Sequence, residues 1–148
     1  MRFALLLHVW GVVIWVGGMF FAYTALRPTA RDVLDPPQRL TLWAGTFRRF
    51  FPSVWLSVAA ILGSGLYLIM AQYRGFAHAP VYIHAMLGVG VLMMLIFGHV
   101  FFAPYRRLRR AVLAQDWPAG ARQLAQLRVL IGINLLLGLV NIAIALLG

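Results

Sequence analysis

The stretch FALLLHVWGVVIWVGGMFFAYTAL, residues 3–26, decides the fold class of this chain. It carries no formal charge and is long enough to cross a bilayer as one helix, which takes roughly 20 apolar residues. One ionisable side chain, His8, lies near its amino-terminal end, and Gly11, Trp15 and Gly18 follow on or beside the same helical face. An imidazole in hydrocarbon needs a polar partner, so His8 is a candidate functional residue.

The rest of the sequence repeats this apolar character. Of the 148 residues, 63% are hydrophobic and 11% are charged, and the charges fall between the apolar stretches. We therefore predict an all-α, polytopic membrane protein with a single domain, residues 1–148. It is expected to be an up-down bundle of four transmembrane helices with helix extensions on the cytoplasmic side. The expected spans are residues 3–26, 50–72, 80–102 and 127–147.

The basic residues, all of them arginine, predict the orientation. Eleven of the 13 arginines lie in the connections 27–49 and 103–128, and only Arg2 and Arg74 lie elsewhere. The positive-inside rule then places those two connections in the cytoplasm. Both termini are expected on the outer, periplasmic side of a bacterial inner membrane. Because the arginines flank membrane spans, we assign them to topology and lipid headgroups and not to nucleic-acid binding.

Several kinds of chemistry are excluded by composition. The chain has no cysteine, so disulfides, thiolate metal sites and c-type haem attachment are ruled out. Its only acidic residues, Asp32, Asp35 and Asp116, lie in the connections, so no carboxylate pair supports hydrolysis. Any reaction must be carried by a bound cofactor or metal.

A second histidine is predicted to lie at the depth of His8. His84 is about four residues into the third span, and His8 about five residues into the first, and both spans enter from the outer side. Two such imidazoles can hold the iron of a b-type haem, or begin a copper site. Gly11 and Gly88 lie one turn from the two histidines and favour a flat cofactor. Their alternative role is close helix packing.

Other residues are assigned to the surroundings of this haem site. Trp15 is deep enough to pack on a macrocycle, and Arg2 and Arg74 are outer-side partners for haem propionates. His99 lies 15 residues after His84 and belongs to the cytoplasmic half. A second haem held by His99 and Met19 is an alternative to a hydrogen bond of His99 within the bundle, or to its contact with a quinone headgroup or a propionate.

Polar side chains also recur within two other spans. Asn134 and Asn141 share one face of the fourth span, and Ser57 and Ser64 share a face of the second. We interpret both stripes as interhelical hydrogen-bonding groups, with lining of a ligand site as the alternative.

The first span, with His8, Gly11 and the run WVGGMFFAY (15–23), resembles small CopD-like (copper resistance protein D) membrane proteins. FFAPYRRLRRA (101–111) and DWPAGARQLAQLRVLIGINLLLG (116–138) are similar to later parts of the same group. The chain is more distantly similar to HemJ-type protoporphyrinogen oxidases, which are four-helix proteins that bind haem b. That resemblance implies His8 and His84 as haem ligands, while Met86 stands where those enzymes have a lysine. The family name implies copper handling.

These observations lead to one main hypothesis and two alternatives. The main one is an inner-membrane electron-transfer protein that holds one b-type haem between the first and third spans, linked to quinol. If it is an enzyme, it is a haem-dependent membrane oxidoreductase. The first alternative is a copper transport or resistance protein that binds Cu(I) through histidines and methionines such as Met86. The second is a non-catalytic small subunit of a larger membrane complex, or a homo-oligomer.

Overall fold

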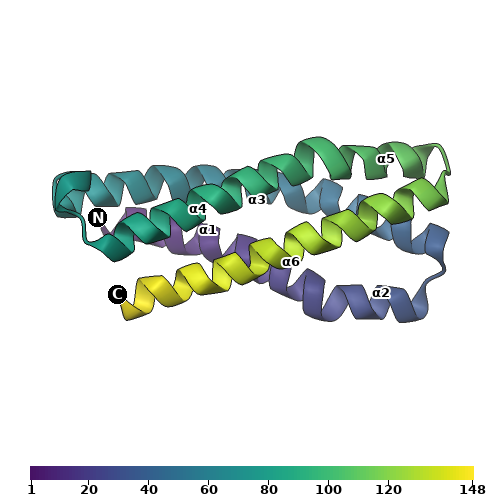
Figure 1. Cartoon of the computed structure of the whole chain (residues 1–148), viewed down its shortest axis with the longest axis horizontal. Helices are drawn as coiled ribbons and strands as arrows, with labels where there is room; N and C mark the ends of the chain where they lie inside the picture. Colours follow the sequence, from purple (N-terminus) through teal and green to yellow (C-terminus); the bar gives the residue numbers. More distant parts are fainter.

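The computed structural model describes all 148 residues, nearly all of them helical (Figure 1). The first half begins with α1 (Arg2–Phe21), which continues through a π-helical turn, η1 (Ala22–Leu26), into α2 (Arg27–Val33). After a two-residue break the long helix α3 (Pro36–Tyr73) returns along α1. These helices are longer than a bilayer core is thick, because part of each one extends beyond its apolar span.

The second half has the same order of elements as the first. A short 3₁₀ turn, η2 (Phe76–His78), leads into α4 (Val81–Val100), which passes through a second π-helical turn, η3 (Phe101–Tyr105), into α5 (Arg106–Leu113). The long helix α6 (Trp117–Leu147) then returns along α4. Four continuous helical rods are thus long and apolar enough to cross a membrane. The predicted all-α, four-helix membrane fold with helix extensions is confirmed.

Turn residues separate the rods. Asp116 caps α6, since its carboxylate accepts a hydrogen bond from the backbone N–H of Ala119 at 3.2 Å. At the opposite end, α3 stops at Arg74 and Gly75, which have φ angles of 57° and 128°. Glycine adopts such positive φ angles without steric cost, so Gly75 suits this turn.

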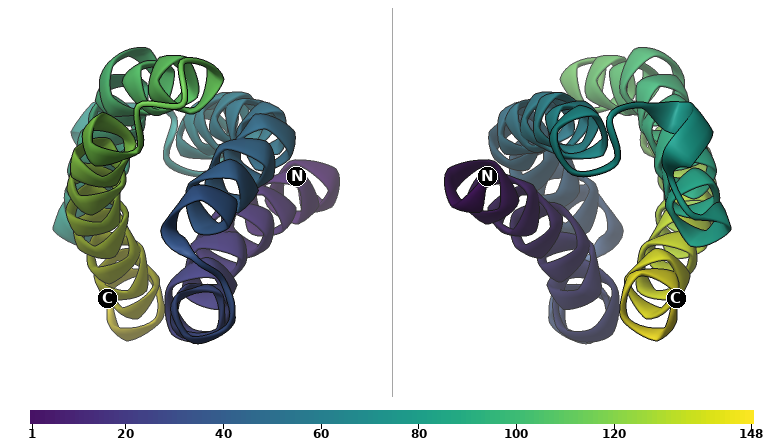
Figure 2. Two further views of the ribbon diagram at one scale, coloured as in Figure 1. Left: turned by 90° about the vertical axis from the view of Figure 1, so that its right-hand side faces the viewer. Right: turned by 90° about the vertical axis from the view of Figure 1, so that its left-hand side faces the viewer.

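Helices pack in two pairs, α1 with α3 and α4 with α6 (Figure 2). Glycines bring α1 close to α3. A Cβ atom at Gly11 would lie 2.7 Å from Cγ1 of Ile61, and one at Gly18 would overlap the ring of Phe50. Side-chain-free backbone at these positions therefore sets how closely the two helices approach.

The buried core of the bundle lies in the half that includes the π-helical turns. Its centre is an aromatic cluster in which Phe51 contacts Tyr105 and Phe97 at ring-centroid distances of 4.8 and 5.4 Å. In the other half the pairs share little core, since no α4 residue between 81 and 92 is buried, and none of α6 after Gly138.

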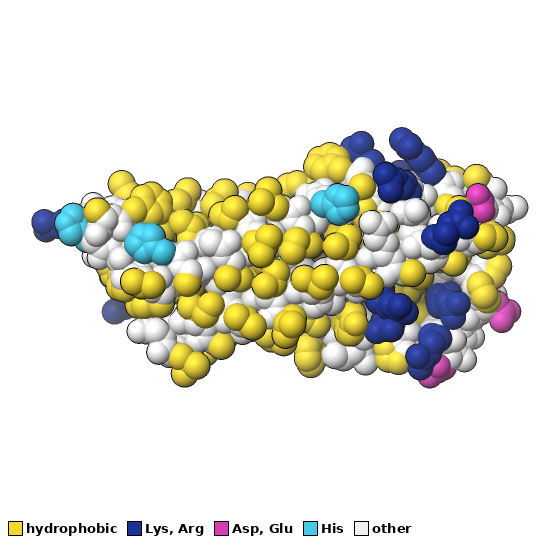
Figure 3. Space-filling view, in the orientation of Figure 1, with side chains coloured by type: hydrophobic (Ala, Val, Ile, Leu, Met, Phe, Trp, Pro, Cys, Tyr) yellow, Lys and Arg dark blue, Asp and Glu magenta, His cyan; other side chains and the backbone are white.

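The charged residues mark the two ends. Arginines gather at the end formed by α2, α5 and the start of α6, whereas the opposite end carries both chain termini (Figures 1 and 3). We call these the arginine-rich end and the terminal end. The uneven distribution seen in the sequence is thus an asymmetry between the two ends of one bundle.

Candidate functional site

His8 lies on α1 in the terminal half and is half-buried against α3. Its Nδ1 atom lies 3.1 Å from the carbonyl oxygen of Ile61 and 3.1 Å from Oγ of Ser64. The hydroxyl of Ser64 in turn donates to the carbonyl of Ala60 at 2.5 Å. Because a carbonyl only accepts, the neutral ring carries its proton on Nδ1 and shares it between Ile61 and Ser64.

This arrangement leaves the other ring nitrogen of His8, Nε2, with a free lone pair. Metal-binding histidines commonly donate their second ring N–H to a backbone carbonyl, which fixes the ring and the tautomer. Gly65 makes room for the ring, since a Cβ atom there would lie 3.2 Å from Cε1 of His8. The ring of His8 is therefore held in one orientation by α3, with one nitrogen available to a ligand.

His84 adopts the same tautomer on α4. Its Nδ1 atom lies 3.1 Å from the carbonyl of Pro80, one turn earlier, so Nε2 again carries the free lone pair. The side chain is exposed, and α4 packs along α6. The hydrogen-bonding partners of His8 Nδ1 are consequently Ser64 and the Ile61 carbonyl on α3, whereas the pairing with His84 through a shared ligand, expected from depth matching, stays a prediction. Depth fixes the level of a residue but not the direction in which its helix presents it.

The two glycines expected to flank a flat cofactor have different surroundings. Gly11 is buried, and a Cβ atom there would meet Ile61 and the carbonyl of Ser57, so its open side is already filled by α3. Gly88 is exposed, and no atom lies within 4 Å of a Cβ placed there. Close helix packing, the alternative role, is thus the one seen at Gly11.

The other residues assigned to the surroundings of a haem differ in burial. Trp15 is 3% exposed and packs edge-on against Phe97, with ring centroids 6.0 Å apart, so it belongs to the core. Met19 is also buried there, whereas His99 is exposed and makes no hydrogen bond within the chain. The expected hydrogen bond of His99 within the bundle is therefore absent, and Met19 and His99 do not share an environment.

Arg2 and Arg74, the expected propionate partners, are both exposed at the terminal end. Neither forms an ion pair, because the only ion pair in the protein joins Arg31 to Asp32. Their guanidinium groups are thus available to an anionic group at that surface.

The two asparagines of α6 form interhelical hydrogen bonds, which confirms the interpretation made from the sequence. Nδ2 of Asn134 donates to the carbonyl of Met93 at 3.3 Å, and Nδ2 of Asn141 donates to that of Met86 at 3.2 Å. Both bonds tie α6 to α4. Such bonds average about 0.6 kcal/mol in membrane proteins, so they fix register more than they add stability.

Comparison with known proteins identifies the family of this chain. The family model of copper resistance protein D matches residues 44–147, from within α3 to the end of α6. The chain belongs to the copper resistance protein D family. No significant match was found among curated proteins or among solved structures.

Membership in the copper resistance protein D family links this membrane protein to copper resistance. The matched region includes His84 and the serine partner of His8, but His8 itself lies before it. The protein contains no cluster of three or more His, Cys, Asp or Glu side chains that would enclose a metal ion. A metal bound by this protein would therefore depend on one or two imidazoles, with thioethers or a cofactor supplying the remaining ligands.

Sequence reasoning missed Ser64 as the partner of His8 and Gly65 as the position that accommodates its ring. Ser64 was placed only in a stripe of polar residues. Its distance from the outer end of the second span, about eight residues, is a signal that would have placed it near the level of His8.

Proposed function

We propose that this member of the copper resistance protein D family binds a redox-active metal centre at its terminal end, and that the centre is the iron of one b-type haem. The observation that carries the proposal is the imidazole of His8. Its Nδ1–H is engaged by the Ile61 carbonyl and by Ser64, and its Nε2 lone pair is free. A buried backbone partner of this kind raises the basicity of the ring and holds it for an axial ligand.

His84 is the proposed second axial ligand. Its Nδ1–H is engaged by the Pro80 carbonyl, so its Nε2 is also in the form that binds iron. Two neutral imidazoles are a donor set that fits haem iron. The sparse burial of α4 between residues 81 and 92 supports a group held between the helix pairs in this half.

Bound haem would supply reversible one-electron transfer. The chain's own contribution would be to fix the tautomer of both ligands and to exclude water from His8 through the contact of α1 with α3. Arg2 and Arg74 are suited to neutralise propionates at the terminal end. A membrane quinol is the proposed electron donor, which makes the protein a membrane oxidoreductase if transfer is coupled to turnover.

The visible spectrum of protein purified from haem-replete cells tests the proposal. We expect a Soret band, a reduced α-band and one haem per chain by pyridine haemochrome. His8→Ala and His84→Ala should each abolish or convert the low-spin spectrum, whereas His99→Ala, at an exposed position beyond the site, should leave it unchanged. A colourless protein after haem supplementation contradicts the proposal.

Copper as cargo is the second candidate function, favoured by the family of the chain. His8 and His84 would bind Cu(I) together with a thioether such as that of Met86, since soft sulfur ligands suit this ion. Metal analysis after copper loading in the membrane is the test. We expect near-stoichiometric copper without a chromophore under this function, reduced by His8→Ala and by Met86→Leu. Copper at background level rules it out.

A further inference from the structure

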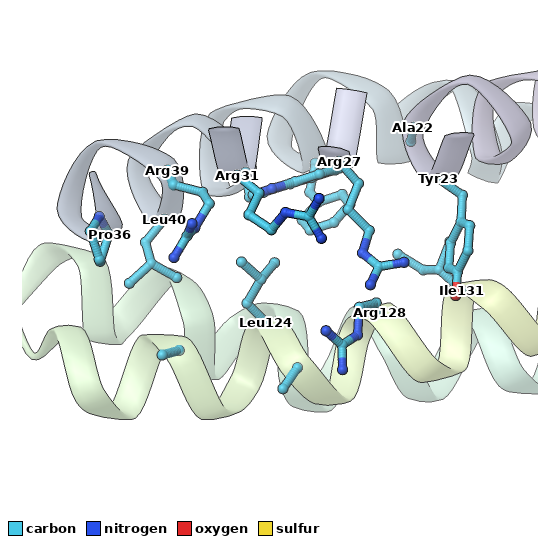
Figure 4. A pocket seen from close by; sticks show the side chains of 14 residues that line it. Ala22, Tyr23, Arg27, Arg31, Pro36, Arg39, Leu40, Leu124, Arg128 and Ile131 are labelled. Carbon is cyan, nitrogen blue, oxygen red and sulfur yellow. The ribbon is translucent and has the colours of Figure 1, made fainter. Parts of the chain in front are cut away.

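The arginine-rich end contains a cavity of about 270 Å³ between α2, α3 and α6 (Figure 4). Four arginines line it, together with aromatic residues at its base. The arginines are Arg27 and Arg31 from α2, Arg39 from α3 and Arg128 from α6. Side chains from three separate helices thus bring positive charge to one hollow.

The π-helical turn η1 and a glycine position one wall of the cavity. Tyr23, Arg27 and Arg31 recur every four residues along η1 and α2, so they share a face. The guanidinium of Arg27 lies over the ring of Tyr23, 4.9 Å from its centroid. That ring rests on α6 at Gly132, where a Cβ atom would come within 2.9 Å of it. Arg27 is therefore held by packing instead of extending freely into solvent.

Three of the four arginines of this cavity have no acidic partner in the protein. No carboxylate lines it, and the single ion pair joins Arg31 to Asp32, whose side chains are both about two-thirds exposed (68% and 66%). Arg27 and Arg39 are partly buried, which reduces the hydration that would otherwise screen their repulsion. A bound anion would relieve this repulsion, and guanidinium groups match phosphate oxygens in bidentate geometry.

A second cavity, of about 170 Å³, adjoins the first and leads into the bundle. The two share Ala22, Phe47 and Ile131 as lining residues, and the inner one is otherwise almost entirely apolar. It extends as far as Asn134, which is 3% exposed and whose Oδ1 atom has no hydrogen-bond partner. The arginine-lined cavity therefore lies next to an apolar cavity between the membrane-spanning helices.

We propose that this double cavity binds an amphiphilic anion, with a phosphate-bearing headgroup among the arginines and an apolar chain in the inner chamber. Anionic phospholipid of the adjacent leaflet has this chemistry. Arginines placed only for membrane orientation need no common cavity, no aromatic base and no apolar chamber behind them. The proposal does not depend on which metal centre the terminal end binds.

Lipid exchange in nanodiscs of phosphatidylcholine tests the proposal, with phosphatidylglycerol as the probe and native mass spectrometry as the readout. Wild-type protein is expected to retain phosphatidylglycerol in preference to phosphatidylcholine. The double variant Arg27→Gln/Arg128→Gln should weaken retention by about tenfold or more, because two charge-assisted contacts are lost. The matched control is Arg107→Gln/Arg110→Gln, which removes the same charge from exposed sites outside the cavity and should change retention by less than about threefold.

A third variant and a competition experiment complete the test. Arg39→Gln repeats the test at a third helix if the double variant is not recovered in folded form. Inorganic phosphate separates a lipid from a soluble anion, and we expect it not to displace phosphatidylglycerol. Equal retention of both lipids, equal losses in the cavity and control variants, or full displacement by inorganic phosphate would each overturn the assignment.

Discussion

Nδ1 of His8 and Oγ of Ser64 are 3.1 Å apart, and this contact joins α1 to α3 at the level of the candidate metal ligand. Ser64→Ala removes one of two acceptors and leaves the Ile61 carbonyl in place. We expect a loss of about 0.5–1.5 kcal/mol in the free energy of unfolding, since the N–H is not left unpaired. Unfolding in mixed micelles measures it, with the exposed Ser53→Ala as control at less than about 0.5 kcal/mol. Equal losses of unfolding free energy in the two variants would mean that the contact between His8 and Ser64 does not stabilise the protein.

The ring of His8 should also respond to its neighbour on α3. Gly65→Ala places a methyl group 3.2 Å from Cε1 of His8, so the imidazole must shift by a few tenths of an ångström against its bonds to Ile61 and Ser64. We expect a weakened or altered metal or haem signal from this histidine. Gly63→Ala is the matched control, because no atom lies within 4 Å of a Cβ there. That control should retain the full signal, and an unchanged spectrum in Gly65→Ala would mean that the ring is not held against this glycine.

Adjacent glycines of α1 are expected to differ strongly in their tolerance of alanine. At Gly18 the added methyl group overlaps the ring of Phe50, whereas at Gly17 it points into open space. Gly18→Ala should lower the free energy of unfolding by about 1–3 kcal/mol, the usual cost of overpacking. Gly17→Ala should be neutral or slightly stabilising, because alanine is the better helix former. Denaturant titration in micelles compares the two, and similar values would contradict the packing of α1 on α3.

Orientation in the membrane can be measured cleanly because the chain has no cysteine. Ala77→Cys places a thiol in the exposed turn between α3 and α4, and Ala114→Cys places one between α5 and α6. The positive-inside rule predicts that an impermeant maleimide labels Ala77→Cys in intact cells, and Ala114→Cys only after permeabilisation. The reverse pattern would place the termini in the cytoplasm.

Four membrane helices and their extensions were predictable because hydropathy and charge act locally along the chain. A run such as residues 3–26 has one stable way to satisfy its backbone in lipid, which is a helix. The linking role of Asn134 and Asn141 was likewise readable, since it needs only a partner helix at the same depth.

The direction in which each helix faces could not be read in this way. Apolar side chains cover every face of these helices, so no hydrophobic stripe distinguishes the side that meets a neighbour from the side that meets lipid. For that reason depth matching alone predicted His84 as the partner of His8 and did not find the hydrogen bond of His8 to Ser64 on α3. The arginine-lined cavity was missed for a related reason. Arg39 and Arg128 were each read as topology signals, and only the tertiary packing brings them together with Arg27.

The two π-helical turns have a shared consequence for the position of the protein in the bilayer. Each carries a tyrosine with an arginine four residues later above its ring, Arg27 over Tyr23 at 4.9 Å and Arg109 over Tyr105 at 5.8 Å. Sliding either rod toward the opposite leaflet would move a guanidinium into hydrocarbon, which is costly. These two pairs therefore mark the level of the membrane–water interface on the bundle. They would fix the depth of the arginine-rich end, which also holds the buried core, whereas the terminal end has little core shared between the two helix pairs.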